Sequence, residues 1–272
     1  MERIFVFLRS PGAATTVLLG ATIIALIVAN SPLATQYMSL VNLPLGPLTA
    51  MEWVNDALMA IFFLFVGLEV KRELVSGELN TNAKRIMPGI AALFGVIVPA
   101  IIFYLIAGSN DVYVHGWAIP TATDIAFAIG VITALGSRVP NSMKVFLTAL
   151  AVIDDLIAII VIAIFYAASI NLFYLVASVI VTGLLIYCNR TGYVRSLSYI
   201  ILGVILWYCI LRSGLHATMA GVILAMTIPE RGKIGKKYVR PMQHWEHYLS
   251  NWVSFVIVPI FAFFNAGVSL GG

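Results

Sequence analysis

Long apolar runs follow one another along almost the whole chain, and they limit its fold more than any other feature. A helix needs about 20 apolar residues, at 1.5 Å per residue, to cross the hydrocarbon core of a bilayer. Of the 272 residues, 61% are hydrophobic and only 10% are charged, which argues against a water-soluble fold. The sequence predicts an all-α polytopic membrane helix bundle with nine spans, at residues 13–30, 53–68, 87–107, 117–135, 145–167, 172–188, 197–211, 215–228 and 252–269.

The basic residues are distributed unevenly between the loops that connect these spans. Fifteen of the 16 Lys and Arg residues fall on one side of the predicted membrane, and only Arg212 falls on the other. The positive-inside rule then places the N-terminus in the cytoplasm and predicts a multi-pass protein of the plasma membrane, surrounded by lipid. A nucleic-acid partner is not expected, because binding nucleic acid requires a basic patch on a folded surface.

Two connections are long enough to hold structure of their own. The external loop at residues 31–52 contains Pro32, Pro44 and Gly46, which predict a short hairpin or a simple turn. The loop at residues 229–251 is the longest polar stretch and is predicted to be cytoplasmic. We find no linker or low-complexity segment in the sequence, so residues 1–272 are expected to form a single membrane domain.

Three aspartates, Asp124, Asp154 and Asp155, lie inside otherwise apolar spans. A carboxylate at the centre of a membrane helix costs about 2.5–3.5 kcal/mol on insertion scales, so its presence needs a reason. A lone aspartate can simply bond a neighbouring helix, but an adjacent pair and a third residue favour an ion or proton site. Carboxylate oxygens can replace the water around a small hard cation, and protons compete for the same oxygens. Such competition is the simplest physical basis for exchange transport.

The residues before Asp124 predict an interrupted membrane helix. Pro120 removes a backbone donor, and Thr121 and Thr123 add hydroxyl groups at membrane depth. Freed carbonyl groups are tolerated there when they line a cavity, and interrupted helices indicate the binding sites of transporters. A simple proline kink is the alternative interpretation of Pro120.

Two other functions fit part of this pattern. Intramembrane aspartyl proteases use two buried aspartates as acid and base, but no Gly-x-Gly-Asp arrangement is present here. A proton-coupled carrier of an organic solute would also need membrane carboxylates, together with aromatic and hydrogen-bonding groups around its cavity. The sequence alone does not locate such groups, so both alternatives stay open at this point.

Several stretches are similar to the NhaA family of sodium/proton antiporters, at residues 53–60, 66–74, 117–130, 149–156, 213–218 and 261–268. The resemblance implies a secondary antiporter, not an enzyme, that exchanges cytoplasmic Na⁺ or Li⁺ for external H⁺. It implies no cofactor, a bacterial inner-membrane location and a role in pH and sodium homeostasis. It also implies roles for particular residues of this chain.

By this resemblance, Asp155 is the principal cation-binding carboxylate, and Asp154 beside it takes part in cation and proton exchange. Both would hold the transported Na⁺ transiently. Thr123 and Asp124 correspond to the interrupted-helix elements next to that site. The family's positions linked to pH response correspond to Glu69, Arg72, Glu73, His216, Glu246 and His247.

The family has twelve spans, and its third to fifth spans are related by inverted symmetry to its tenth to twelfth. We expect this chain to carry one half of that repeat pair and to lack the last three helices, including a membrane lysine. These 272 residues alone are therefore expected to transport poorly. The external hairpin is short compared with family members that dimerise through it, which leaves a homodimer open.

Overall fold

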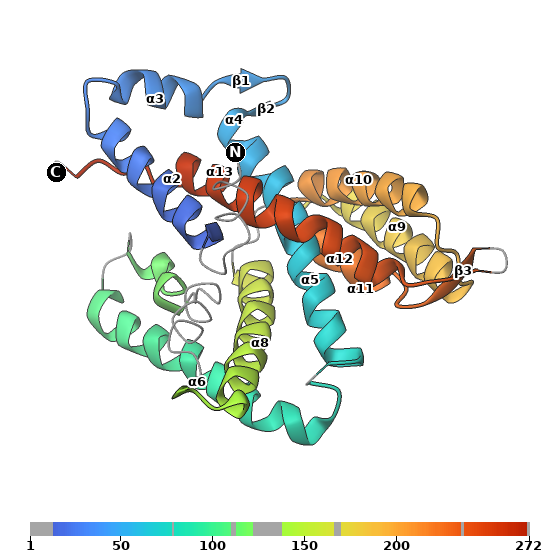
Figure 1. The fold of residues 1–272 in the computed structure, drawn as a ribbon. Helices are drawn as coiled ribbons and strands as arrows, with labels where there is room; N and C mark the ends of the chain where they lie inside the picture. The colour runs from blue at the N-terminus through green and yellow to red at the C-terminus, as the bar shows by residue number, and fades with distance from the viewer. Residues whose placement is uncertain are drawn as a thin grey trace, which may run out of the picture. The chain divides into compact units, whose positions relative to one another are not determined.

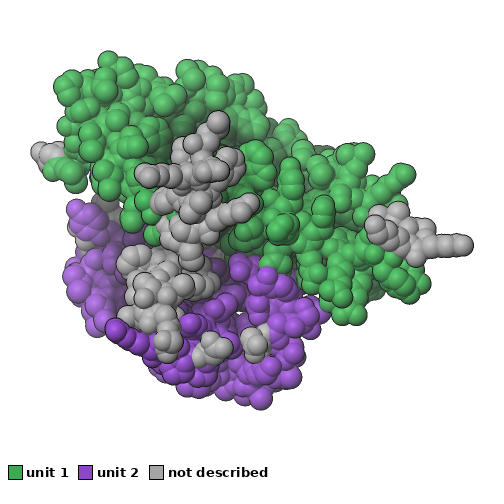
Figure 2. Space-filling model, viewed as in Figure 1, with its two compact units in different colours: residues 1–68, 168–272 green, residues 69–167 purple. Residues whose placement is uncertain are grey.

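The computed structural model describes residues 13–77, 79–109, 113–121, 138–165, 170–234 and 237–270. Contacts divide the chain, which the sequence predicts to be one membrane domain, into two compact units (Figure 2). Unit 1 contains residues 1–68 and 168–272, and unit 2 contains residues 69–167. Each unit is described by itself.

Unit 1 is built from helices at both ends of the sequence (Figure 1). Its N-terminal part holds α2 (Ala13–Ala29), α3 (Ala34–Val41), β1 (Pro44–Leu45), β2 (Leu48–Thr49), α4 (Ala50–Glu52), η1 (Trp53–Leu58) and most of α5 (Met59–Val75). Its C-terminal part holds α9 (Leu172–Arg190), α10 (Ser196–Ser213), α11 (Met219–Thr227), β3 (Gly232–Ile234), β4 (Lys237–Val239), α12 (Pro241–Trp252), η5 (Val253–Ile257) and α13 (Val258–Asn265).

Unit 2 begins with the last turns of α5. It continues with α6 (Asn82–Ala107), the 3₁₀ turns η2 (Val114–Gly116) and η3 (Ile119–Thr121), and α8 (Asn141–Phe165). The long helices α6 and α8 pack against each other, and η3 packs against α6.

The core of unit 1 forms where α5, α9, α10, α11 and α12 meet. Leu68, Leu185, Leu206 and Met242 are fully buried there, each from a different helix. Close packing depends on small residues: a Cβ at Gly221 of α11 would collide with the backbone of α5 at Ala60. Glycine at a helix contact lets two backbones approach closely, as is common in membrane bundles.

Two membrane-spanning helices of unit 1 are interrupted by a π-helical turn. The turn η1 joins α4 to α5 within the continuous span Ala50–Val75, and η5 joins α12 to α13 within Pro241–Asn265. Such turns are rare, and they occur frequently at functional sites. The capping box of Thr49 and Glu52 starts the first of these two spans.

Among the described residues, five helices are long and apolar enough to cross a membrane, and the bent pair of α2 and α3 is a candidate sixth. These residues confirm the polytopic all-α fold, and α8 adds a 25-residue helix where a span was predicted. The predicted span at 117–135 lies mostly outside the described residues. The count of nine spans therefore stays a prediction.

Three details of the sequence prediction are corrected. Within the span predicted at 215–228, only Met219–Thr227 is α-helical, as the nine-residue helix α11, which is about 14 Å long. The last span begins at Pro241, not at residue 252, and its helix ends at Asn265. The predicted loop at 229–251 consequently contains the β3–β4 hairpin and most of α12. Of the short hairpin or simple turn predicted within 31–52, the structure shows the hairpin, formed by β1 and β2, and α3 precedes it.

Candidate cation-binding site

The adjacent carboxylates Asp154 and Asp155 lie near the middle of α8. Asp154 follows Asn141 by 13 residues and precedes Phe165 by 11, so each helix end is about 16–20 Å away. Asp154 is buried, with 4% of its surface exposed, and Asp155 is half-buried. If α8 crosses the membrane, as its length allows, both carboxylates lie close to mid-depth.

The contact between α6 and α8 fixes the direction of these carboxylates. A Cβ at Gly89 of α6 would lie 4.0 Å from Ile153 Cδ1 on α8, so Ile153 faces α6. Successive residues of an α-helix are about 100° apart, which puts Asp155 about 200° around α8 from Ile153. Asp155 therefore lies on the side of α8 away from α6. Asp154, about 100° around α8 from Ile153, lies between that side and the side that faces α6.

The beginning of the predicted interrupted span is not α-helical. Ile119–Thr121 forms only the 3₁₀ turn η3, in which the Thr121 hydroxyl donates to the Ala118 carbonyl at 2.8 Å. Trp117 packs edge-on against Phe165 at the end of α8, with ring centroids 5.2 Å apart. The segment before Asp124 is thus held against α6 and α8. Thr123 and Asp124 themselves lie outside the described residues, so their place in the site stays a prediction.

The charged residues at the end of α5 form one cluster in unit 2. Arg72 Nη2 lies 2.9 Å from Glu73 Oε1 and 3.8 Å from Glu69 Oε1. Arg72 thus pairs with its neighbour in the sequence and with the residue three positions before it. These side chains are partly exposed, and ion pairs of that kind contribute little to stability.

Arg85 joins this end of α5 to the first turn of α6. Its Nε donates to the Leu79 carbonyl at 2.5 Å, and its Nη2 donates to the Leu74 carbonyl at 3.1 Å. The last carbonyl groups of a helix have no partner within the helix, so a side chain that binds them stabilises the helix end. Sequence reasoning counted Arg85 only as a loop charge, because nothing in the sequence shows which carbonyls it reaches.

The remaining predicted pH-response residues belong to unit 1. His216 lies in the turn between α10 and α11, close enough to Asp56 of η1 for an electrostatic interaction. Glu246 is buried on α12, with 9% exposure, whereas His247 is exposed on the same helix. The structure thus assembles Glu69, Arg72 and Glu73 into one cluster but distributes the predicted pH-response residues over both units.

Polar groups that sequence reasoning did not single out connect η1 to neighbouring helices. Asn265 Nδ2 at the end of α13 donates to Asn55 Oδ1 of η1 at 2.8 Å. The Trp207 indole of α10 donates to the Asp56 carbonyl at 2.9 Å. Asparagines inside apolar spans are the signal that could have identified the first of these bonds, because such groups require a partner in lipid.

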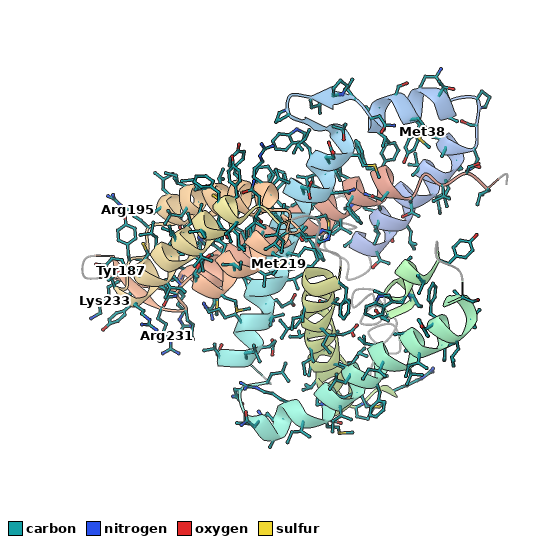
Figure 3. The ribbon with its side chains drawn as sticks, turned by 180° about the vertical axis from the view of Figure 1, so that it is seen from behind. Met38, Tyr187, Arg195, Met219, Arg231 and Lys233 are labelled. Carbon is teal, nitrogen blue, oxygen red and sulfur yellow. The ribbon has the colours of Figure 1, made fainter. Side chains whose placement is uncertain are left out.

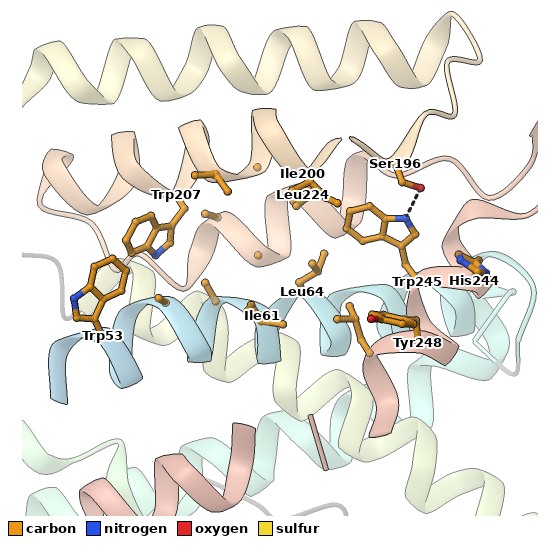
Figure 4. A pocket seen from close by; sticks show the side chains of 17 residues that line it. Trp53, Ile61, Leu64, Ser196, Ile200, Trp207, Leu224, His244, Trp245 and Tyr248 are labelled. Atoms are coloured by element: carbon orange, nitrogen blue, oxygen red, sulfur yellow. Dashed lines mark hydrogen bonds between the residues drawn. The ribbon is translucent and has the colours of Figure 1, made fainter. Parts of the chain in front are cut away.

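An apolar pocket of about 660 Å³ lies between α5, α10, α11 and α12 (Figure 4). The stacked rings of Trp53 and Trp207 line one end, and Trp245, whose indole donates to Ser196 Oγ at 3.1 Å, lines the other. None of the described residues that line this pocket carries a carboxylate. Because a hard cation requires oxygen ligands, the pocket is unsuited to Na⁺, and α8 remains the better candidate.

Comparison with known proteins adds independent evidence. The model of the Na⁺/H⁺ antiporter 1 family matches residues 6–272. A Na⁺/H⁺ antiporter NhaA of Mesorhizobium japonicum is 53% identical over 269 residues, which are 98% of this chain and 68% of that protein. The NhaA of Brucella ovis is 50% identical over 268 residues, with the same coverage. The NhaA of Rhizobium etli is 48% identical over 270 residues, which cover 98% of this chain and 69% of its own.

These matches cover almost every residue of the chain, including both units and all the motifs that carried the resemblance. They support transport rather than enzymatic catalysis, and neither a protease nor an organic-solute carrier is favoured. Together with the all-α membrane fold, they establish that this chain belongs to the NhaA family of Na⁺/H⁺ antiporters.

Proposed function

We propose that this chain exchanges cytoplasmic Na⁺ or Li⁺ for external protons across the bacterial inner membrane, using Asp154 and Asp155 as the shared binding groups. The observation that carries the proposal is an adjacent carboxylate pair, buried and half-buried, in the middle of the long apolar helix α8. Family membership supports the nature of the transported ions. The cations are substrates, and the proposal includes no resident cofactor.

The chemistry follows from two carboxylates at neighbouring positions. A cation that leaves water needs oxygen ligands, and the pair supplies up to four of them. Protons bind to the same oxygens, so a site that holds a proton cannot hold Na⁺ with the same affinity. Alternating exposure of such a site to the two sides of the membrane yields exchange.

Thr123 and Asp124 are proposed to complete this site from the interrupted span. The 3₁₀ turn at Ile119–Thr121 supports a broken helix there, because its backbone does not continue as an α-helix. We further propose that Glu69, Arg72, Glu73, His216, Glu246 and His247 adjust activity to pH. The ion pairs around Arg72 support this role, since protonating Glu69 or Glu73 would weaken them.

The orientation with a cytoplasmic N-terminus is likewise proposed. Arg195, Arg231 and Lys233 gather at one end of unit 1, and Met38 of α3 lies at the other end (Figure 3). Basic residues favour the cytoplasmic side, so the end with the β3–β4 hairpin is assigned to the cytoplasm. A homodimer is compatible with this arrangement, and the bilayer lipids are the remaining partner.

Asp155→Asn tests the function directly. It should abolish binding of radioactive Na⁺ to the purified chain and, in everted membrane vesicles, abolish whatever Na⁺-dependent proton movement the parent chain shows. Asp154→Asn should also weaken both signals, because it removes one negative charge and replaces one of the four carboxylate oxygens with an NH₂ group. The matched control is Glu230→Gln, which removes a partly exposed carboxylate that pairs with Arg231 before β3, and which should leave Na⁺ binding unchanged.

Measuring Na⁺ binding as well as proton movement distinguishes a loss of cation binding from a loss of transport alone. A binding signal that survives in Asp155→Asn with unchanged affinity would contradict the assignment of Asp155. Proton movement in the parent chain that requires an organic solute and ignores Na⁺ would contradict the proposed substrate.

A further inference from the structure

The connection from α2 to α5 is unusual because it carries no charge. Between Arg9 and Glu52 the sequence contains no Asp, Glu, Lys or Arg, although residues 31–51 lie in a connection between spans. Five leucines occur within residues 33–48. A loop that faces water normally exposes charged side chains, so this composition indicates a less polar environment.

One face of α3 is fixed to the rest of unit 1. Tyr37 and Val41, one helical turn apart, are each 4% exposed. The Tyr37 hydroxyl donates to the Phe263 carbonyl at 2.6 Å, and its ring packs edge-on against the Phe263 ring. A Cβ at Gly267 would collide with the same tyrosine ring. These contacts prevent α3 from rotating about its own axis, so the directions in which its other side chains point are fixed.

The side chains beside this face are apolar and exposed. They form a surface, here named the α3–β1 apolar surface, that consists of Leu33, Met38, Leu40, Leu43 and Leu45, with exposed fractions between 44% and 53%. The opposite side of α3 is polar and exposed, with Thr35, Gln36 and Ser39. Such a division into apolar and polar sides is typical of helices that lie in a membrane interface.

The direction of α3 agrees with that location. Its axis is bent by 118° from α2, which is 28° more than a right angle. The helix α2 exposes Leu19, Ile23, Ile24 and Ile27, as a membrane-crossing helix does. If α2 runs along the membrane normal, α3 lies about 28° out of the membrane plane and points back toward the side from which α2 comes (Figure 1).

Trp53 places the β1–β2 hairpin at the same depth in the membrane as α3. Its indole donates to the Leu45 carbonyl at 2.9 Å, and its ring stacks on Trp207. Tryptophan is enriched at the level of the lipid headgroups, where its ring is apolar and its N–H finds a partner. A hairpin bonded to Trp53 therefore sits near the interface.

We propose that the α3–β1 apolar surface is inserted into the bilayer interface on the side where α2 ends. Its partner is the acyl-chain and glycerol region of the lipids rather than their charged headgroups, because this segment has no charge to pair with them. A stable interface with a second copy of the chain would use about 20–30 residues a side, so the five residues of this surface would form only a small part of one.

Site-specific labelling tests the proposal in the full chain. Met38→Cys carries an environment-sensitive fluorophore, and Thr35→Cys on the polar side of α3 is the matched control. Both are made in a background in which Cys188 is replaced by Ser and Cys209 by Ala, and both are reconstituted in liposomes. Lipids with a nitroxide at a shallow acyl position should quench the label at residue 38 several-fold more than the label at residue 35.

Iodide, a quencher dissolved in the water phase, should quench the label at residue 35 more than the label at residue 38. The quenching should be the same in neutral phosphatidylcholine and in mixtures with anionic lipid, since burial rather than charge drives insertion. Leu40→Cys provides a second apolar position, and a melting temperature equal to that of the unlabelled parent establishes that each variant is folded.

Three results would overturn the proposal. Equal quenching by iodide at residues 35 and 38 means that α3 is in water. If the protection of residue 38 from iodide increases with the protein-to-lipid ratio, a second copy of the chain covers the surface. Quenching that requires anionic lipid means that headgroup charge, not apolar burial, controls the contact.

Discussion

At the residue scale, the adjacent aspartates of α8 illustrate what a sequence can predict about a membrane site. Asp154 and Asp155 stand out because any carboxylate in an apolar run is costly, and the helical period places both in one turn. Their directions could not be predicted, because they depend on the contact of Ile153 with α6 near Gly89. That contact joins residues 64 positions apart, and no local pattern encodes it.

The bonds of Arg85 give a prediction at the same scale. Arg85→Ala removes the donors to the Leu74 and Leu79 carbonyls, and should lower the free energy of unfolding by about 1–3 kcal/mol. Lys84→Ala removes a neighbouring exposed charge and should change it by less than about 0.5 kcal/mol. Thermal unfolding of both variants in detergent measures the difference. Equal melting temperatures would mean that solvent satisfies these carbonyls.

At the element scale, hydropathy predicts the uniformly apolar helices well and the amphipathic ones poorly. The helices α6, α9 and α10 start or end within a few residues of their predicted limits, because most of their residues are apolar. The helix α12 was assigned to a loop, since its polar side chains lower the average hydropathy. Its helical start depends on Pro241 at the first turn, and on the burial of Met242 and Glu246 in unit 1.

The contact between α5 and α11 supports a prediction about these elements. A Cβ at Gly221 would collide with the Ala60 carbonyl, so Gly221→Val should force the two helices apart and lower stability by about 1–3 kcal/mol. Gly183 of α9 has open space around it, so Gly183→Ala should be neutral or stabilising by up to about 1 kcal/mol. Size-exclusion profiles after heating compare the variants. A Gly221→Val protein as stable as its parent would show that this packing is adjustable.

At the scale of the whole molecule, charge distinguishes the two ends of unit 1. The end with the β3–β4 hairpin carries Arg231 and Lys233, whereas the α3 end lies in a stretch without any charged residue. The sequence predicts this asymmetry completely, because the positive-inside rule needs only the order of loops and spans. It does not predict the division into two units, which depends on contacts between helices far apart in the chain.

A topology experiment belongs to this scale. In intact cells, Lys233→Cys should resist a membrane-impermeant thiol reagent, and Ser39→Cys on the polar side of α3 should react with it. Both variants lack Cys188 and Cys209. Permeabilising the cells should make residue 233 reactive, which establishes that its thiol is accessible. Labelling of residue 233 from outside would reverse the proposed orientation.

The π-helical turns η1 and η5 have a consequence for how these helices tolerate insertions and deletions. A π turn accommodates one residue more than an α turn, so the segment after it keeps the direction that it would have in a regular helix with one residue fewer. Deleting one residue of η5 would therefore restore a continuous α-helix without rotating α13 relative to α12, and Asn265 would still face Asn55. Deleting one residue from the middle of a regular helix such as α9 would instead rotate the following part by about 100°. A π turn is thus a place where a membrane helix can lose a residue and keep its contacts with its neighbours.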